Sequence, residues 1–115
     1  MKFNRDILLI RSMHKYITDT ERFASELEMS FEKFSADDKS KYAINMCLLQ
    51  IGELVIKLSD EFKLKHDGVP WRKIAAFRHR AAHAYEELKI TIVWQIAVED
   101  IPLLKTFVEA ILNET

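Results

Sequence analysis

Turn-forming residues are scarce in this chain, and their scarcity restricts the fold more than any other feature. The 115 residues include only two Gly and two Pro. A β-sandwich or β-barrel needs turn residues roughly every 8–12 positions, which four such residues do not supply. Apolar residues instead recur at the i, i+3/i+4, i+7 spacing of helices along almost the whole chain. The sequence therefore predicts an all-α fold, an antiparallel bundle of four or five helices.

Length and composition predict one domain over residues 1–115, because 49% apolar and 30% charged residues suit a small core with a solvated surface. No apolar run approaches the roughly 18 residues of a membrane span. The charged N-terminus is unlike a signal peptide. The single Cys47, on an apolar stripe, is expected to be buried and unreactive. We expect a cytoplasmic protein with no membrane association.

The helical pattern divides into segments whose bounds can be predicted. They cover about 4–28, 30–34, 38–62, a helix that follows Pro70, 90–94, and a last helix that restarts near Asp100 and runs to about 112. Residues 90–94 have strand-like composition but no second strand to pair with, so a helix is favoured. The 38–62 helix is apolar on two faces, which favours a partner subunit as cover for the second. Gly52 in its middle indicates that another helix approaches closely.

Charge is unevenly distributed along the chain. Residues 63–80 contain six Lys and Arg against the single Asp67, whereas residues 18–38 and 86–115 are acidic. A basic segment of this kind favours binding of a polyanion. A solvated helix face balanced by acidic neighbours is the alternative.

Chemically versatile side chains gather in residues 71–85. Arg78, His79, Arg80, His83 and Tyr85 are of the types that bind phosphate, transfer protons and donate hydrogen bonds. The same five residues would also suit a solvated helix face. We expect no metal and no cofactor, because the chain lacks a Cys pair, a His-Glu-x-x-His motif and a Gly-rich phosphate loop. The i, i+4 spacing of His79 and His83 provides half a metal site at most.

The motif Arg78-x4-His83-x-Tyr85, preceded by Pro70 and Trp71, resembles the HEPN superfamily. The resemblance is strongest to the HepT-like toxins that are paired with minimal nucleotidyltransferase antitoxins. It extends over about residues 39–112 and includes the stretches 49–53, 69–74, 93–94 and 101–104. His79 departs from the pattern, since the residue after the motif Arg is commonly Asn or Asp.

The resemblance implies a HEPN-like bundle, a two-fold dimer and a metal-independent ribonuclease toxin that cleaves RNA through attack by the 2′-OH. Arg78 and His83 would be catalytic, and His79 and Arg80 would bind substrate. The nucleotidyltransferase antitoxin would attach AMP to Tyr85.

Helical geometry raises a difficulty for this assignment. At about 100° per residue, Arg78 and His83 are about 140° apart around a straight helix, whereas Arg78 and Tyr85 nearly coincide. A dimer would supply the second proton-transfer group that one His83 lacks. The alternative function is a non-catalytic HEPN module that binds nucleotides, RNA or a protein partner.

Overall fold

The computed structural model describes residues 2–84 and 89–115, and these ranges are helical with no β-strand. The elements in chain order are α1 (Lys2–Glu26), α2 (Phe31–Ala36), α3 (Asp38–Lys57), α4 (Asp60–Lys65), α5 (Trp71–Ala84), α6 (Ile90–Gln95), the π-helix η1 (Ile96–Asp100) and α7 (Ile101–Asn113). The last three follow without a break. Four long helical stretches and two short helices therefore confirm the predicted all-α bundle.

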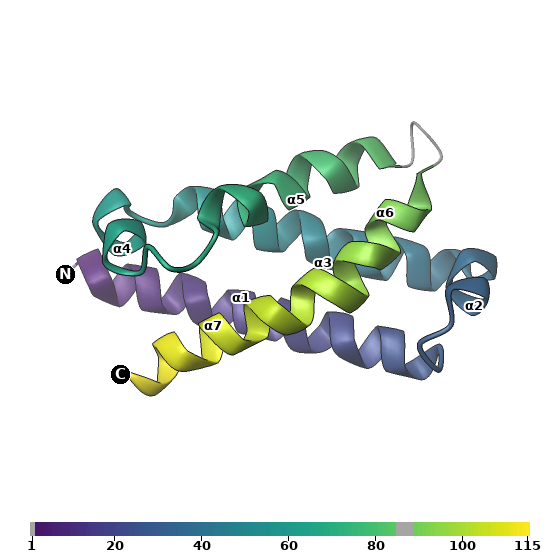
Figure 1. Cartoon of the computed structure of the whole chain (residues 1–115), viewed down its shortest axis with the longest axis horizontal. Coiled ribbons are helices and arrows are strands. Elements are labelled where there is room, and N and C mark those ends of the chain that lie inside the picture. Colours follow the sequence, from purple (N-terminus) through teal and green to yellow (C-terminus); the bar gives the residue numbers. More distant parts are fainter. Residues whose placement is uncertain (1, 85–88) are drawn as a thin grey trace.

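The long helices run back and forth along an elongated body of 45 × 26 × 20 Å. α3 packs between α1 and α5, and α7 packs on α1 (Figure 1). The start of α1 and the end of α7 lie at the same end of the molecule (Figure 1). None of the helices in the described ranges has an apolar stretch long enough to cross a membrane.

The core consists of side chains that each helix contributes from one face. The largest fully buried side chains are Phe34, Phe62, Phe77, Ile10, Met13, Ile17, Ile44, Leu48, Ile51, Ile96, Ile101 and Val55. Burial of one such side chain stabilises the fold by about 1.5–3 kcal/mol. Cys47 is buried, as predicted, and its burial raises the pKa of the thiol.

The predicted continuous helix over 38–62 is wrong, because α3 ends at Lys57 and α4 begins at Asp60. Ser59 caps α4, since its Oγ accepts a hydrogen bond from the Phe62 amide at 3.2 Å. The buried carboxylate of Asp6 accepts hydrogen bonds from the Ser59 amide and hydroxyl at 2.9 and 2.7 Å. A contact from α1, 53 residues away in sequence, thus stabilises a break that the apolar periodicity does not reveal.

The C-terminal region also differs from its predicted bounds. Residues 90–94 are helical in α6, as predicted, but the helix does not restart at Asp100. It continues through η1, where the Ile101 amide donates to the Ile96 carbonyl. Pro102 has no amide hydrogen and sits in the first turn of α7. The wider π register just before it lets the backbone pass Pro102 without ending the helix.

The second apolar face of α3 is covered mainly by this chain, contrary to the expectation of a partner as its cover. Ile44, Leu48 and Val55 are at most 1% exposed. Ile56 from that face is exposed instead, together with Tyr42 and Met46. The exposed apolar residues of α3 therefore follow a line that differs from the predicted second face.

Candidate functional site

Gly52 brings α5 into close contact with α3. A Cβ atom at Gly52 would lie 2.6 Å from the backbone nitrogen of Arg78 and 3.1 Å from the carbonyl oxygen of Ala75. Such distances are shorter than van der Waals contact, so only glycine fits between the two helices. The close approach predicted from Gly52 is confirmed, and it fixes the backbone of Arg78 against α3.

Glu53, the next residue on α3, forms an ion pair with Arg78. The Arg78 Nε lies 2.9 Å from the Glu53 Oε2, and the two side chains are 58% and 37% exposed. An ion pair this exposed contributes at most about 1 kcal/mol to stability. Its clearer effect is orientation, because the contact engages Nε and directs the rest of the planar guanidinium. The two terminal nitrogens can then bind a phosphate together.

Arg78, His79 and His83 line one open hollow between α3 and α5, which we call the α5 hollow. Its volume is about 580 Å³, and its remaining lining residues are Leu49, Ile56, Ala75 and Ala82. The imidazole rings of His79 and His83 lie 4.2 Å apart between centroids and are tilted by 51°. The structure thus brings together three of the predicted site residues, although Arg78 and His83 lie on different stripes of the helix.

Arg80 does not belong to the α5 hollow. It lines a separate hollow on the side of α5 that faces α6 and η1, together with Glu99 and Asp100. Lys73 lines the same hollow and forms an ion pair with Asp100 at 3.2 Å. The basic residues of α5 that line the two hollows therefore lie on two different sides of this helix.

One predicted site residue is outside the described part of the chain, and one contact of the site was not predicted. Tyr85, the predicted site of AMP attachment, lies outside the described residues. Glu53 was not singled out as functional, although it belongs to the 49–53 stretch that carries the family resemblance. Its contact with Arg78 becomes evident only when α3 and α5 are packed.

A comparison with family models shows to which protein family the chain belongs. The family model described as "Ribonuclease HepT-like" matches residues 13–111. The chain belongs to the HepT-like ribonuclease family. The match covers the α5 hollow and Gly52, and it confirms the resemblance that the sequence motif indicated.

Curated relatives of this HepT-like chain come from several prokaryotes. A protein named "Probable ribonuclease HepT" from Thermococcus cleftensis is 37% identical over 78 residues, which is 68% of this chain and 71% of the relative. Proteins named "Putative RNase" come from Caldanaerobacter subterraneus (37% identical, 75% of this chain and 77% of the relative) and Methanocaldococcus jannaschii (30%, 87% and 81%). No solved structure matches the chain.

In residues 2–84 and 89–115, no group of three or more His, Cys, Asp or Glu side chains is placed to hold a metal ion. The neighbouring rings of His79 and His83 therefore supply two ligands of the usual four.

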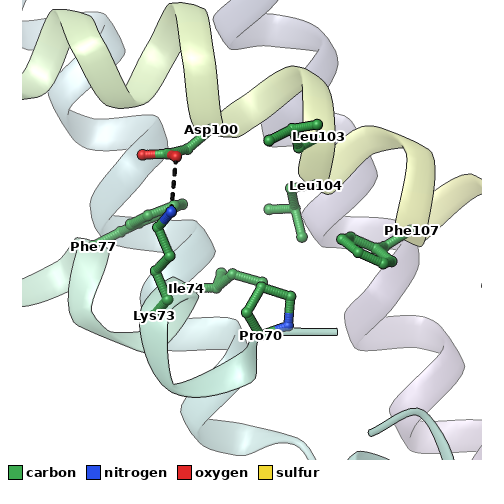
Figure 2. A pocket seen from close by; sticks show the side chains of 8 residues that line it. All are labelled: Pro70, Lys73, Ile74, Phe77, Asp100, Leu103, Leu104 and Phe107. Atoms are coloured by element: carbon green, nitrogen blue, oxygen red, sulfur yellow. Dashed lines mark ion pairs between the residues drawn. The ribbon is translucent and has the colours of Figure 1, made fainter. Parts of the chain in front are cut away.

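A second, smaller pocket lies between α5 and α7 (Figure 2). Its volume is about 70 Å³, and its lining residues are Pro70, Lys73, Ile74, Phe77, Asp100, Leu103, Leu104 and Phe107. The ion pair between Lys73 and Asp100 lies at one side of an otherwise apolar wall (Figure 2). This wall carries neither a histidine nor an arginine, so the α5 hollow is the better candidate for the HepT-like active site.

Proposed function

We propose that this HepT-like chain, as one domain over residues 1–115, is a metal-independent ribonuclease and the toxin of a toxin–antitoxin pair. The observation that carries the proposal is the α5 hollow, which Arg78, His79 and His83 line together, with Glu53 paired to Arg78. The family and the names of its relatives support RNA as the substrate.

The chemistry of RNA cleavage matches these side chains. The ribose 2′-OH attacks the adjacent phosphorus, a base takes the hydroxyl proton, and an acid protonates the departing 5′-oxygen. Histidine, with an unperturbed pKa near about 6.5, suits either proton transfer, and His83 is the proposed group. Arg78 stabilises the charge that develops on the phosphorane, and His79 helps to hold the substrate. Because RNA supplies its own nucleophile, the reaction does not depend on a metal-bound water.

A second copy of the chain completes the proposed site. Tyr42, Met46 and Ile56 follow one another along one face of α3 and are 67%, 53% and 50% exposed. Leu49 lies on this line between Met46 and Ile56 and, with Ile56, also lines the α5 hollow. We propose that two chains pair across this face, which brings two α5 hollows together and provides two His83 side chains for the two proton transfers.

The test of the ribonuclease proposal is RNA cleavage by the purified protein in the presence of EDTA. We expect Arg78→Lys to reduce cleavage by about 100-fold, because an ammonium group does not reproduce the planar two-point contact with phosphate. His83→Ala should likewise abolish most cleavage. Arg72→Lys is the matched control, since Arg72 is exposed on α5 but does not line the α5 hollow.

The results separate the ribonuclease from a binding module. If Arg78→Lys cleaves RNA as fast as the wild type, Arg78 is not a catalytic residue. RNA that is retained but never cleaved by the wild type would favour the non-catalytic alternative.

The proposed toxin is switched off by a minimal nucleotidyltransferase antitoxin that attaches AMP to Tyr85. The added phosphodiester is negatively charged and would compete with RNA for the basic groups of the site. After co-expression with the antitoxin, intact mass measurement should show one or more added AMP units that are lost in Tyr85→Phe. They should remain in Tyr42→Phe, which changes an exposed tyrosine on α3. A toxin that is neutralised without any mass increase would contradict the modification.

A further inference from the structure

We propose that His79 and His83 form a half-site for Zn²⁺ and that zinc bound there switches off the proposed RNA cleavage. The metal in this proposal is a reversible inhibitor and takes no part in the reaction. Zinc binding follows from the two imidazoles alone, whereas its effect on cleavage rests on the proposed function.

The geometry of the two rings suits one shared ion. His79 and His83 are four residues apart on α5, both are exposed, and their ring centroids are 4.2 Å apart. Side chains at this helical spacing are neighbours, and the same i, i+4 spacing lets two histidines of one helix bind a single zinc ion. Zinc lies about 2.0–2.1 Å from each imidazole nitrogen, so binding requires one nitrogen of each ring to turn toward a shared point.

The surroundings leave room for the ion. Ala75 and Ala82 line the α5 hollow beside the two rings and present only methyl groups. Among the described residues no group of three ligands forms here, so these residues supply two of the four ligands that zinc usually takes. Two imidazoles alone bind zinc reversibly rather than as a permanent structural ion.

Electrostatics permits a cation despite the nearby arginine. Arg78 lines the same hollow, and its positive charge alone would repel zinc. Glu53 offsets this charge through the 2.9 Å ion pair. Lys73 and Arg80 line the hollow on the other side of α5. Arg72 is two helical turns away, at about 10 Å along the axis, where salt screens most of its effect.

Zinc would block cleavage by binding the nitrogen atom that proton transfer needs. A metal binds imidazole through the nitrogen lone pair that a general base uses to take a proton. A zinc-bound His83 therefore loses that nitrogen for proton transfer, and the ion also fills space where the scissile phosphate would lie. Removal of the metal makes that nitrogen available for proton transfer again.

The binding test is a calorimetric titration of the purified, metal-free chain with Zn²⁺ alone. We expect saturable binding at micromolar metal that becomes about tenfold weaker or more in His79→Gln and in His83→Gln. His14→Gln and His66→Gln are the matched controls, because those histidines lie near Glu109 and Glu114, away from the α5 hollow. Wild-type affinity in His79→Gln, or no saturable binding by the wild type, would overturn the site.

A further variant separates this site from the proposed function. Arg78→Lys keeps both imidazoles, so it should bind zinc even though its cleavage is about 100-fold slower. Zinc binding by a wild type that never cleaves RNA would leave the site in place and refute the ribonuclease. Cleavage by the wild type should fall over the same zinc concentrations that fill the site and return with EDTA. Undiminished cleavage at saturating zinc would overturn the inhibitory role.

Discussion

Glu53 contacts Arg78 at one edge of its guanidinium group. The carboxylate lies 2.9 Å from Nε, so this contact restricts the directions in which the two terminal nitrogens can point. Arginine on an exposed helix face otherwise samples many rotamers, and a fixed partner reduces the entropy that phosphate binding costs. Glu53 is therefore expected to act as a positioning residue.

We expect Glu53→Ala to lower the kcat of RNA cleavage by about tenfold or more, because Arg78 loses its fixed orientation. The free energy of unfolding should change by less than about 1 kcal/mol, as is usual for exposed ion pairs. Steady-state kinetics and urea unfolding measure the two effects. Glu26→Ala is the control, since it removes an exposed ion pair with Arg22 on α1. Unchanged kcat in Glu53→Ala would show that Arg78 needs no such partner.

Of the four predicted site residues that the structure describes, three lie together and one lies apart. His79 and His83 lie with Arg78, as the motif suggested, because all three line the α5 hollow. Arg80 was grouped with them because it is close in sequence, but two residues along a helix rotate a side chain by about 200°. Glu53 was missed because it is 25 residues from Arg78, and no local pattern reports a contact between two helices.

Among the helices, the contact of α3 with α5 decides whether the site forms. Gly52→Ala would place a methyl group 2.6 Å from the Arg78 backbone nitrogen, which forces the helices apart. We expect a net loss of about 1–2 kcal/mol in the free energy of unfolding, despite the better helix propensity of alanine. Cleavage should fall as well, because the displaced α5 carries Arg78 and His83.

Gly68 provides the matched control for this substitution. No atom lies within 4 Å of a Cβ built there, and its φ is not positive. Gly68→Ala should therefore be neutral or stabilising by up to about 1 kcal/mol, since it restricts the unfolded chain. Urea unfolding of both variants measures the contrast. Equal effects at the two glycines would contradict the argument from close packing.

The elements also show which boundaries a sequence can predict. The start of α2 at Ser30 follows from a local cap, because the Ser30 hydroxyl accepts from the Lys33 amide. The break before α4 depends on Asp6, which is distant in sequence. The apolar pattern does not reveal this break, because Leu58 before it and Phe62 after it are both buried. Local signals therefore predict the caps that use nearby residues and miss those supplied by another helix.

For the whole molecule, the exposed apolar line on α3 predicts self-association. Ile56→Glu would place a charge within the proposed interface, where it loses its hydration. We expect the sedimentation mass to fall from that of two chains to that of one, 13.5 kDa. Leu103→Glu is the control, because Leu103 is 64% exposed but belongs to the opposite pocket between α5 and α7. A wild type that sediments as a single chain would contradict the proposed dimer.

The scarcity of glycine has a genetic consequence when combined with the packing at Gly52. Each single-base change of a glycine codon that alters the amino acid introduces a Cβ atom, and at Gly52 any such atom meets the backbone of α5. If the protein arrests growth, survivors selected from a random mutant library should carry changes at codon 52 as well as at the codons of Arg78 and His83. Codon 68 also encodes glycine, but its residue has open space around it, so this codon should be nearly silent in the same selection.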